Sequence, residues 1–301
     1  MNFYSKTLCL LDRNVVSDIR NIESVPGPRA DLARNCDLYT YTISPLLSSL
    51  EGKLGIMPKL EDVRTCLDEE SRLLSGFYKC ATIDNLFSQN VLKINKFIEI
   101  LLDDKYEKHE FYAQLIRYFR SEFVEKKKLK FCENAVNHVF SLCDEFKISA
   151  GHPIVICGLS LIYEAESESN SIARKILKPS LKESGADIEK ADYNALSDLL
   201  NISTLSLISA TIQEEIKNDV TKAHVRYVTN DKALNTFFSL FFSAASRSIL
   251  IDAGKHVHVL SNVKLNTKEL FPRLAAEESK LDDLAARIYK QSQGVERDIL
   301  R

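Results

Sequence analysis

Acidic residues follow two short apolar segments that lie near opposite ends of the chain. Residues 7–11 and 226–229 have the apolar and β-branched character of buried strands. Asp12 follows the first segment, and Asn230 and Asp231 follow the second. In α/β proteins, ligand sites lie beyond the carboxyl ends of the strands. Carboxylates that meet there are hard to keep ionised without a cation, so the pattern predicts a metal site.

Further elements have to position these side chains. Residues 38–43 are rich in aromatic and β-branched residues and predict another strand. Ser44 and Pro45 then begin a helix that carries Glu51. Strand signals become rare after residue 60, and apolar residues recur at helical spacing. The sequence therefore predicts an α/β protein: a parallel-sheet core flanked by helices (residues 1–59 and 186–265), a large all-helical insertion (60–185) and a C-terminal helical extension (266–301).

Three motifs resemble those of PIN-like nucleases. TLCLLDRNVVSDI, from residue 7, resembles the opening strand and helix of that family, with Asp-x-Asn at the end of the strand. YTISPLLSSLEG, from residue 41, is similar to its second strand and helix, where a glutamate faces the site. RYVTNDKAL, from residue 226, resembles its last motif. The helical block from 60 to 179 is much longer than in small PIN-like proteins, and the resemblance says nothing about it.

The resemblance implies a set of acidic metal ligands. These are Asp12, Glu51, Asp231 and one aspartate of the segment 192–198, for which Asp198 is favoured over Asp192. The implied cofactor is Mg²⁺ or Mn²⁺, which bind carboxylate oxygens and act on phosphodiesters. Supporting roles in holding ligands or water fall to three neutral polar residues: Asn14, Thr229 and Asn230.

Each of these residues alone has a simpler explanation. Asp12 and Asp231 stand where a carboxylate can cap the following helix. Glu51 can be a solvated residue in the last turn of its helix. Only the ordered combination of the three motifs favours a metal site over these explanations.

Basic residues in the helical block form a candidate strip for nucleic-acid phosphates, with aromatic residues nearby. A solvated helix face is the competing interpretation. The candidate residues are Arg117, Arg120, Lys126, Lys127 and Lys128, with Lys105 close by in the sequence.

Composition limits the class of protein. The 301 residues carry a net charge of −2, with 45% hydrophobic and 27% charged residues, which is typical of a globular protein and not of a basic nucleic-acid coat protein. Seven cysteines at irregular spacing predict reduced thiols and no zinc site. We find no signal peptide and no apolar run of membrane-spanning length, so the sequence predicts a cytoplasmic protein without a membrane partner.

The resemblance to PIN-like nucleases thus implies a metal-dependent endoribonuclease that hydrolyses RNA, with a role as a toxin or defence effector. DNA presents the same phosphates, so the motifs do not separate the two substrates. A second copy of the chain or a regulatory protein is a further candidate partner. A haloacid-dehalogenase-like phosphohydrolase is one alternative, although Asn14 stands where that family needs an acid. A non-catalytic PIN-like module that binds RNA or protein is the other.

Overall fold

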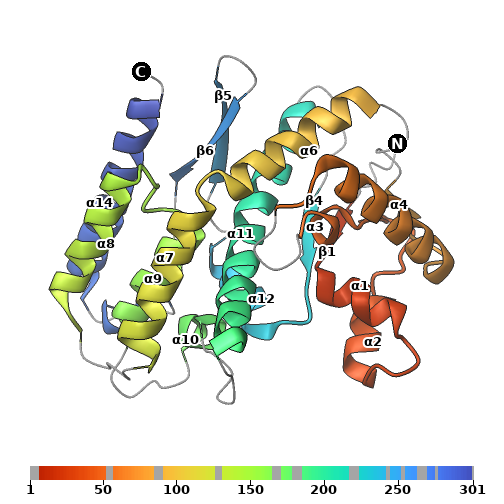
Figure 1. The fold of residues 1–301 in the computed structure, drawn as a ribbon, viewed down its shortest axis with the longest axis horizontal. Helices are drawn as coiled ribbons and strands as arrows, with labels where there is room; N and C mark the ends of the chain where they lie inside the picture. Colours follow the sequence, from red (N-terminus) through yellow and green to blue (C-terminus); the bar gives the residue numbers. More distant parts are fainter. Residues whose placement is uncertain are drawn as a thin grey trace. The chain divides into compact units, whose positions relative to one another are not determined.

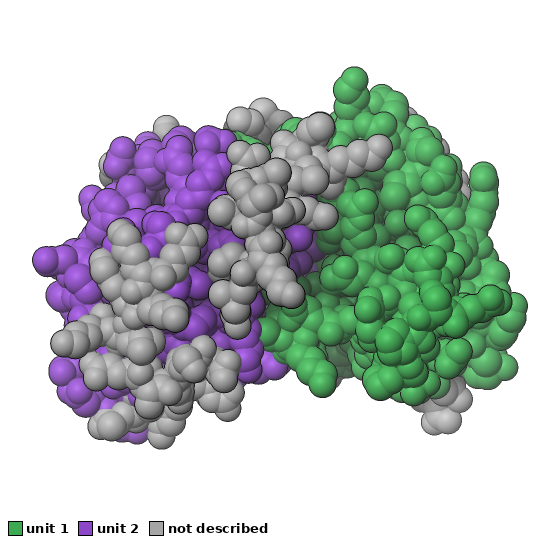
Figure 2. All heavy atoms as spheres, turned by 60° about the horizontal axis from the view of Figure 1, so that its bottom comes forward, with its two compact units in different colours: residues 1–107, 207–235 green, residues 108–206, 236–301 purple. Residues whose placement is uncertain are grey.

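The structure is a computed structural model in which the chain forms two compact units, coloured separately in Figure 2. Unit 1 comprises residues 1–107 and 207–235, and unit 2 comprises residues 108–206 and 236–301. The structure describes residues 7–51, 57–84, 91–125, 131–164, 171–177, 185–216, 224–241, 245–251, 255–262, 270–274 and 277–299.

A four-stranded parallel sheet forms the centre of unit 1 (Figure 1). The strands are β1 (Thr7–Leu11), β2 (Tyr41–Ser44), β3 (Thr82–Ile83) and β4 (His224–Val228), in the spatial order β3-β2-β1-β4. In the register, Leu10 lies opposite Ser44 on one side and Tyr227 on the other. The carboxyl ends of β1, β2 and β4 therefore lie at one edge of the sheet.

The core of unit 1 forms because the strands are apolar on both faces, as buried parallel strands require. Cys9, Leu11 and Ile43 pack with Val15 and Ile19 of the first helix, and all five are almost completely buried. The helices of this unit are α1 (Arg13–Arg20), α2 (Gly27–Arg34), α3 (Leu46–Ser49), α4 (Leu60–Phe77) and α6 (Val91–Tyr106).

Unit 2 is mainly helical. Every residue of its helix α9 (Pro153–Ile162) is buried. The other helices are α7 (His109–Phe119), the π-helix η1 (Arg120–Glu125), α8 (Glu133–Glu145), α10 (Ile172–Leu177), the 3₁₀-helix η2 (Pro272–Leu274) and α14 (Glu278–Ile299). Helices α11 (Gly185–Ile216) and α12 (Lys232–Phe241) continue from one unit into the other.

A two-stranded antiparallel hairpin, β5 (Ala245–Ile251) and β6 (Lys255–Asn262), also belongs to unit 2. Helix α14 packs on the body of this unit, with Leu281, Leu284 and Ile288 buried. Its Ser292 hydroxyl accepts a hydrogen bond from Ser149 over 2.8 Å.

The predicted α/β class is confirmed, with a small parallel sheet in a helix-rich chain. The boundaries differ from those predicted, because α4, β3 and α6 belong to the unit that contains the sheet. Strand β3 was not predicted, since two residues are too short to show a strand pattern. All seven cysteines are free thiols, as expected. None of the helices within the described ranges combines the length and apolar composition that a membrane crossing requires.

Candidate functional site

Two of the predicted acidic residues, Asp12 and Asp231, lie at the point where the strand order of the sheet reverses. The chain proceeds outward from β1 to β2 and β3, and β4 then pairs on the opposite side of β1. Such a reversal leaves a crevice beyond the carboxyl ends of the two strands, where open α/β sheets bind their ligands. Asp12 directly follows β1, and Thr229, Asn230 and Asp231 directly follow β4.

Asp12 is held by the end of β4 and does not act as a helix cap. Its backbone N–H donates to the Val228 carbonyl over 2.9 Å, which extends the pairing of β1 with β4 by one residue. It occupies the N-cap position of α1, but its side chain makes no capping hydrogen bond. Instead, Asp12 Oδ2 accepts hydrogen bonds from Thr229 Oγ1 (2.7 Å) and Asn14 Nδ2 (3.4 Å). A cap on α1 therefore does not account for the contacts of the Asp12 side chain with Thr229 and Asn14.

Glu51 completes a pair of carboxyl groups. It lies two residues beyond the end of α3, half-buried, and its side chain forms a hydrogen bond with Asp12. Burial raises the pKa of Asp12 above its ordinary value, and hydrogen bonds from Thr229, the Arg13 backbone, Glu51 and Asn14 offset part of this rise. Two carboxyl groups in contact share a proton, or a cation takes the place of that proton.

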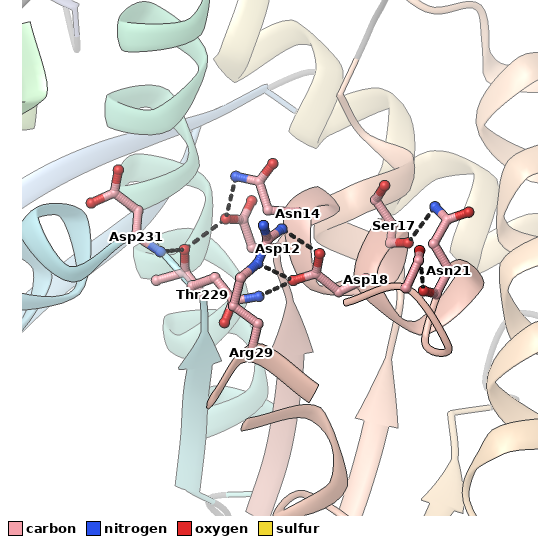
Figure 3. A network of polar contacts seen from close by, with 10 residues as sticks. Asp12, Asn14, Ser17, Asp18, Asn21, Arg29, Thr229 and Asp231 are labelled. Carbon is pink, nitrogen blue, oxygen red and sulfur yellow. Dashed lines mark hydrogen bonds and ion pairs between the residues drawn. The ribbon is translucent and has the colours of Figure 1, made fainter. Parts of the chain in front are cut away.

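Asp231 reaches this pair through its backbone. Its N–H donates to Thr229 Oγ1 over 3.1 Å, so the Thr229 hydroxyl is aligned between Asp231 and Asp12 (Figure 3). The exposed carboxylate of Asp231 points away from Asp12 in this view and accepts a hydrogen bond from the Leu234 N–H over 2.8 Å. Asp231 therefore caps α12 with its Oδ1 atom, as the simpler explanation predicted, and this cap does not use its Oδ2 atom.

Two buried acids that the sequence interpretation missed support this site. Asp18 on α1 accepts a hydrogen bond from Asn230 Nδ2, which binds the segment after β4 to α1. Glu70 on α4 accepts hydrogen bonds from the hydroxyls of Ser48 and Ser49, each over 3.1 Å, and so anchors α3 just before Glu51. Helical spacing gives no signal for either residue, because single acids are common on helix surfaces.

A third missed acid follows strand β3. Asp84 is 5% exposed, and its N–H donates to the Ile43 carbonyl over 2.7 Å. Thr82 and Ile83 followed by Asp84 repeat on a shorter scale the pattern of a strand that ends in a carboxylate. This pattern was the feature of the sequence from which Asp84 could have been predicted.

Asp192 and Asp198 lie in unit 2, on α11. Asp192 is engaged by two arginines: its Oδ1 pairs with Arg120 Nη1, and its Oδ2 lies 3.8 Å from Arg117 Nε. An aspartate in such an ion pair is a poor candidate for a metal ligand. Asp198 is half-buried, and its assignment as the third ligand stays a prediction.

The structure does not place all of the predicted basic residues on the surface. Arg120 is only 2% exposed and pairs with Asp192, so it cannot contact a nucleic acid on the surface. Lys105 is equally buried, and its Nζ donates to the Leu50 carbonyl over 3.4 Å. Arg117 is exposed. The remaining members of the strip, Lys126, Lys127 and Lys128, lie outside the described residues.

The donor set is compatible with a hydrated magnesium or manganese ion. Within the described ranges, no three or more acidic, histidine or cysteine side chains gather closely enough to hold a metal together. Magnesium, however, keeps several waters and is commonly bound by one or two carboxylates together with substrate phosphates. Asp12 and Glu51 together supply two carboxylates. A cation bound to them would offset the free-energy cost of burying the charge of Asp12.

Comparisons with known proteins add no relative to this description: no family model, no curated protein and no solved structure matches the chain.

Proposed function

We propose that the protein is a metal-dependent endoribonuclease whose reaction takes place beside Asp12 and Glu51. The observation that carries the proposal is the contact between these two carboxyl groups at the strand-order reversal, with Asp12 buried and aligned by Thr229. An acid kept in so costly a position without a capping role is typical of a functional site.

Each residue has a distinct task in this proposal. Asp12 and Glu51 would hold the ion, and Mg²⁺ or Mn²⁺ when bound supplies an activated water and stabilises the leaving oxygen of the phosphodiester. Thr229 keeps Asp12 Oδ2 oriented through its 2.7 Å hydrogen bond. Asp231 supports this arrangement through its backbone N–H, which donates to Thr229 Oγ1 over 3.1 Å.

Asn14 favours metal-assisted hydrolysis over the covalent chemistry of haloacid-dehalogenase-like enzymes. Its amide donates to Asp12 Oδ2 over 3.4 Å. An amide nitrogen cannot deliver a proton to a leaving group as a carboxylic acid does. The substrate preference for RNA, and a role in growth arrest or defence, follow from the motif resemblance alone.

The test is a cleavage assay on labelled single-stranded RNA and DNA with Mn²⁺ or Mg²⁺. We expect RNA cleavage by the wild type, none with chelator, and a loss of at least about a hundredfold in Asp12→Asn and Glu51→Gln. Asp31→Asn is the matched control, because Asp31 is an exposed aspartate of α2 in the same unit. Equal cleavage by the wild type and Asp12→Asn would contradict the proposal, as would no cleavage of either nucleic acid.

A further inference from the structure

Arg29 on α2 is an exposed arginine that a buried acid holds in a fixed orientation. Its Nε donates to Asp18 Oδ2 over 2.9 Å, and its Nη2 donates to Asp18 Oδ1. The two partners differ sharply in exposure: 50% of the Arg29 side chain is exposed, but only 5% of that of Asp18. This two-point contact fixes the plane of the guanidinium group at the surface.

The same short segment connects Arg29 to the acidic pair. Thr229 donates to Asp12, and the next residue, Asn230, donates to Asp18, which binds Arg29. Figure 3 shows Asp12, Thr229, Asp18 and Arg29 within this one network. All of them belong to unit 1, so the fold of that unit alone sets their arrangement.

The guanidinium group has donors that Asp18 does not use. Arginine carries five N–H groups, and the contact with Asp18 uses Nε and Nη2. Among the described residues, no acceptor binds Arg29 Nη1. A half-exposed, oriented guanidinium with available N–H groups suits the oxygens of a phosphate, which arginine recognises through paired hydrogen bonds.

We propose that Arg29 binds a backbone phosphate of the nucleic-acid substrate and that Asp18 is its positioning residue. This inference rests on the proposed nuclease function. Asp18 neutralises part of the arginine charge, which weakens the attraction to a phosphate. It also fixes the Arg29 side chain before the ligand binds, so binding costs less conformational entropy than it would for a flexible surface arginine. The ligand class is therefore a phosphodiester backbone, contacted beside the acidic pair and without base recognition.

Helix α2 offers a matched control for Arg29. Arg34 lies on the same helix and is 58% exposed, but the ion pair that it forms joins Nη1 to Asp31 over 3.5 Å, and Asp31 is itself 64% exposed. The two arginines therefore carry the same charge at similar exposure and differ in anchoring and in connection to Asp12. Replacement of either by methionine changes the net charge equally.

The first experiment measures binding of fluorescein-labelled single-stranded oligouridine by anisotropy, in Mg²⁺, with Asp12→Asn added to every variant to prevent cleavage. We expect Arg29→Met to bind about tenfold more weakly and to reduce the slope of log K against log salt by about one. Arg29→Lys should keep the slope and recover part of the affinity, and Arg34→Met should change affinity less than about twofold. Equal effects of Arg29→Met and Arg34→Met would overturn the inference, as would the absence of any binding.

Folding is controlled separately, because Arg29→Met leaves the buried Asp18 carboxylate without its ion-pair partner. The double variant Asp18→Asn/Arg29→Met removes both charges, and the amide oxygen that replaces the carboxylate can still accept a hydrogen bond from Asn230. We expect this variant to melt near the wild-type temperature and to bind as weakly as Arg29→Met. Wild-type affinity in the folded double variant would also overturn the inference.

Cleavage kinetics without the Asp12 substitution separate this inference from the proposed function. If Arg29 contributes binding energy, Arg29→Met raises KM about tenfold and leaves kcat within about twofold. Normal kinetics in an active Arg29→Met protein would overturn the inference and leave the nuclease proposal standing. Binding that depends on Arg29 in a protein without cleavage would support the phosphate contact and contradict the nuclease proposal.

Discussion

Thr229 donates a hydrogen bond to Asp12 over 2.7 Å, although 217 residues separate the two in the sequence. The pairing of β1 with β4 brings them together, and the Asp231 N–H sets the direction of the hydroxyl by donating to it. This contact explains why the Asp12 side chain leaves the N-terminus of α1 uncapped. The cost of keeping Asp12 buried has consequences that can be measured.

Thr229→Val should weaken the site and the fold together. Valine has nearly the shape of threonine but offers no hydroxyl, so Asp12 loses a donor and the Asp231 N–H loses an acceptor. We expect a loss of about 1–2 kcal/mol in the free energy of unfolding, measured by urea denaturation at about pH 7. The pKa of Asp12 should rise further, so Mn²⁺ binding should require a higher pH. Thr229→Ser keeps the hydroxyl and should retain both properties; equal losses in the two variants would assign the effect to packing.

Asp12→Asn should stabilise the metal-free protein at neutral pH, even though it abolishes the proposed activity. Burial raises the pKa of Asp12 above its ordinary value of 3.8, so the folded state binds the proton more tightly than the unfolded state. The contribution of Asp12 to stability is therefore fully present below pH 3.8 and declines as the pH rises through the higher folded-state pKa. We expect a gain of about 0.5–2 kcal/mol at about pH 8 with chelator.

The measurement for this prediction is urea denaturation of both proteins at about pH 3.5, 5 and 8, a series chosen to bracket the ordinary value of 3.8. The difference between them should be smallest at the lowest pH and largest at the highest. Mn²⁺ at about a hundred times its dissociation constant should then raise the stability of the wild type by about 2.7 kcal/mol and leave Asp12→Asn unchanged. Stabilisation of both proteins by the metal would indicate that Asp12 is not a ligand.

The sequence predicted the strands around the site well, because buried parallel strands leave a continuous apolar pattern. Strand β1 has the predicted bounds, and β4 lies within two residues of its predicted ones. Helix α3 was predicted to carry Glu51 but ends at Ser49. Ser48 and Ser49 bind the buried Glu70 instead, a tertiary contact that local propensity does not reveal.

The supporting residues could not be predicted, because their roles depend on contacts between distant segments. In the sequence, Asp18 is an ordinary acidic residue of a helix. The structure shows that both Asn230 and Arg29 donate hydrogen bonds to it. In the same way, Arg120 looked like part of a basic strip because the sequence does not show that Asp192 lies against it. The sequence does not distinguish a buried arginine from an exposed one, because only tertiary packing determines which of them is buried.

Glu70→Ala should disturb the site from a distance. The carboxylate accepts hydrogen bonds from both Ser48 and Ser49, so its removal leaves two buried hydroxyls without their acceptor. We expect a loss of about 2–4 kcal/mol in unfolding free energy and weaker Mn²⁺ binding, because α3 precedes Glu51. Glu69→Ala is the control, since Glu69 is an exposed neighbour on the same helix. Equal stability of the two variants would show that Glu70 does not anchor α3.

Arg120→Met should destabilise the protein through Asp192. The two side chains form a buried ion pair, and removing one partner leaves the other charge uncompensated. We expect a loss of about 3–5 kcal/mol for Arg120→Met. Arg117→Met should cost less than about 1 kcal/mol, because that arginine is exposed and lies 3.8 Å from the carboxylate. If Asp192 is a structural partner and not a metal ligand, Asp192→Asn should lower stability without changing Mn²⁺ affinity in the folded protein.

Two glycines should respond to alanine in opposite directions. At Gly158 in α9, a Cβ atom would lie 1.9 Å from the Cζ atom of the completely buried Phe119 ring. Gly158→Ala should therefore cost about 1–3 kcal/mol through displacement of α7 from α9. At Gly76 in α4, a Cβ atom would meet no atom within 4 Å, so Gly76→Ala should add about 0.5–1 kcal/mol by favouring the helix. Thermal unfolding of the two variants tests this packing directly, because a neutral Gly158→Ala would mean that α7 and α9 are farther apart than the structure shows.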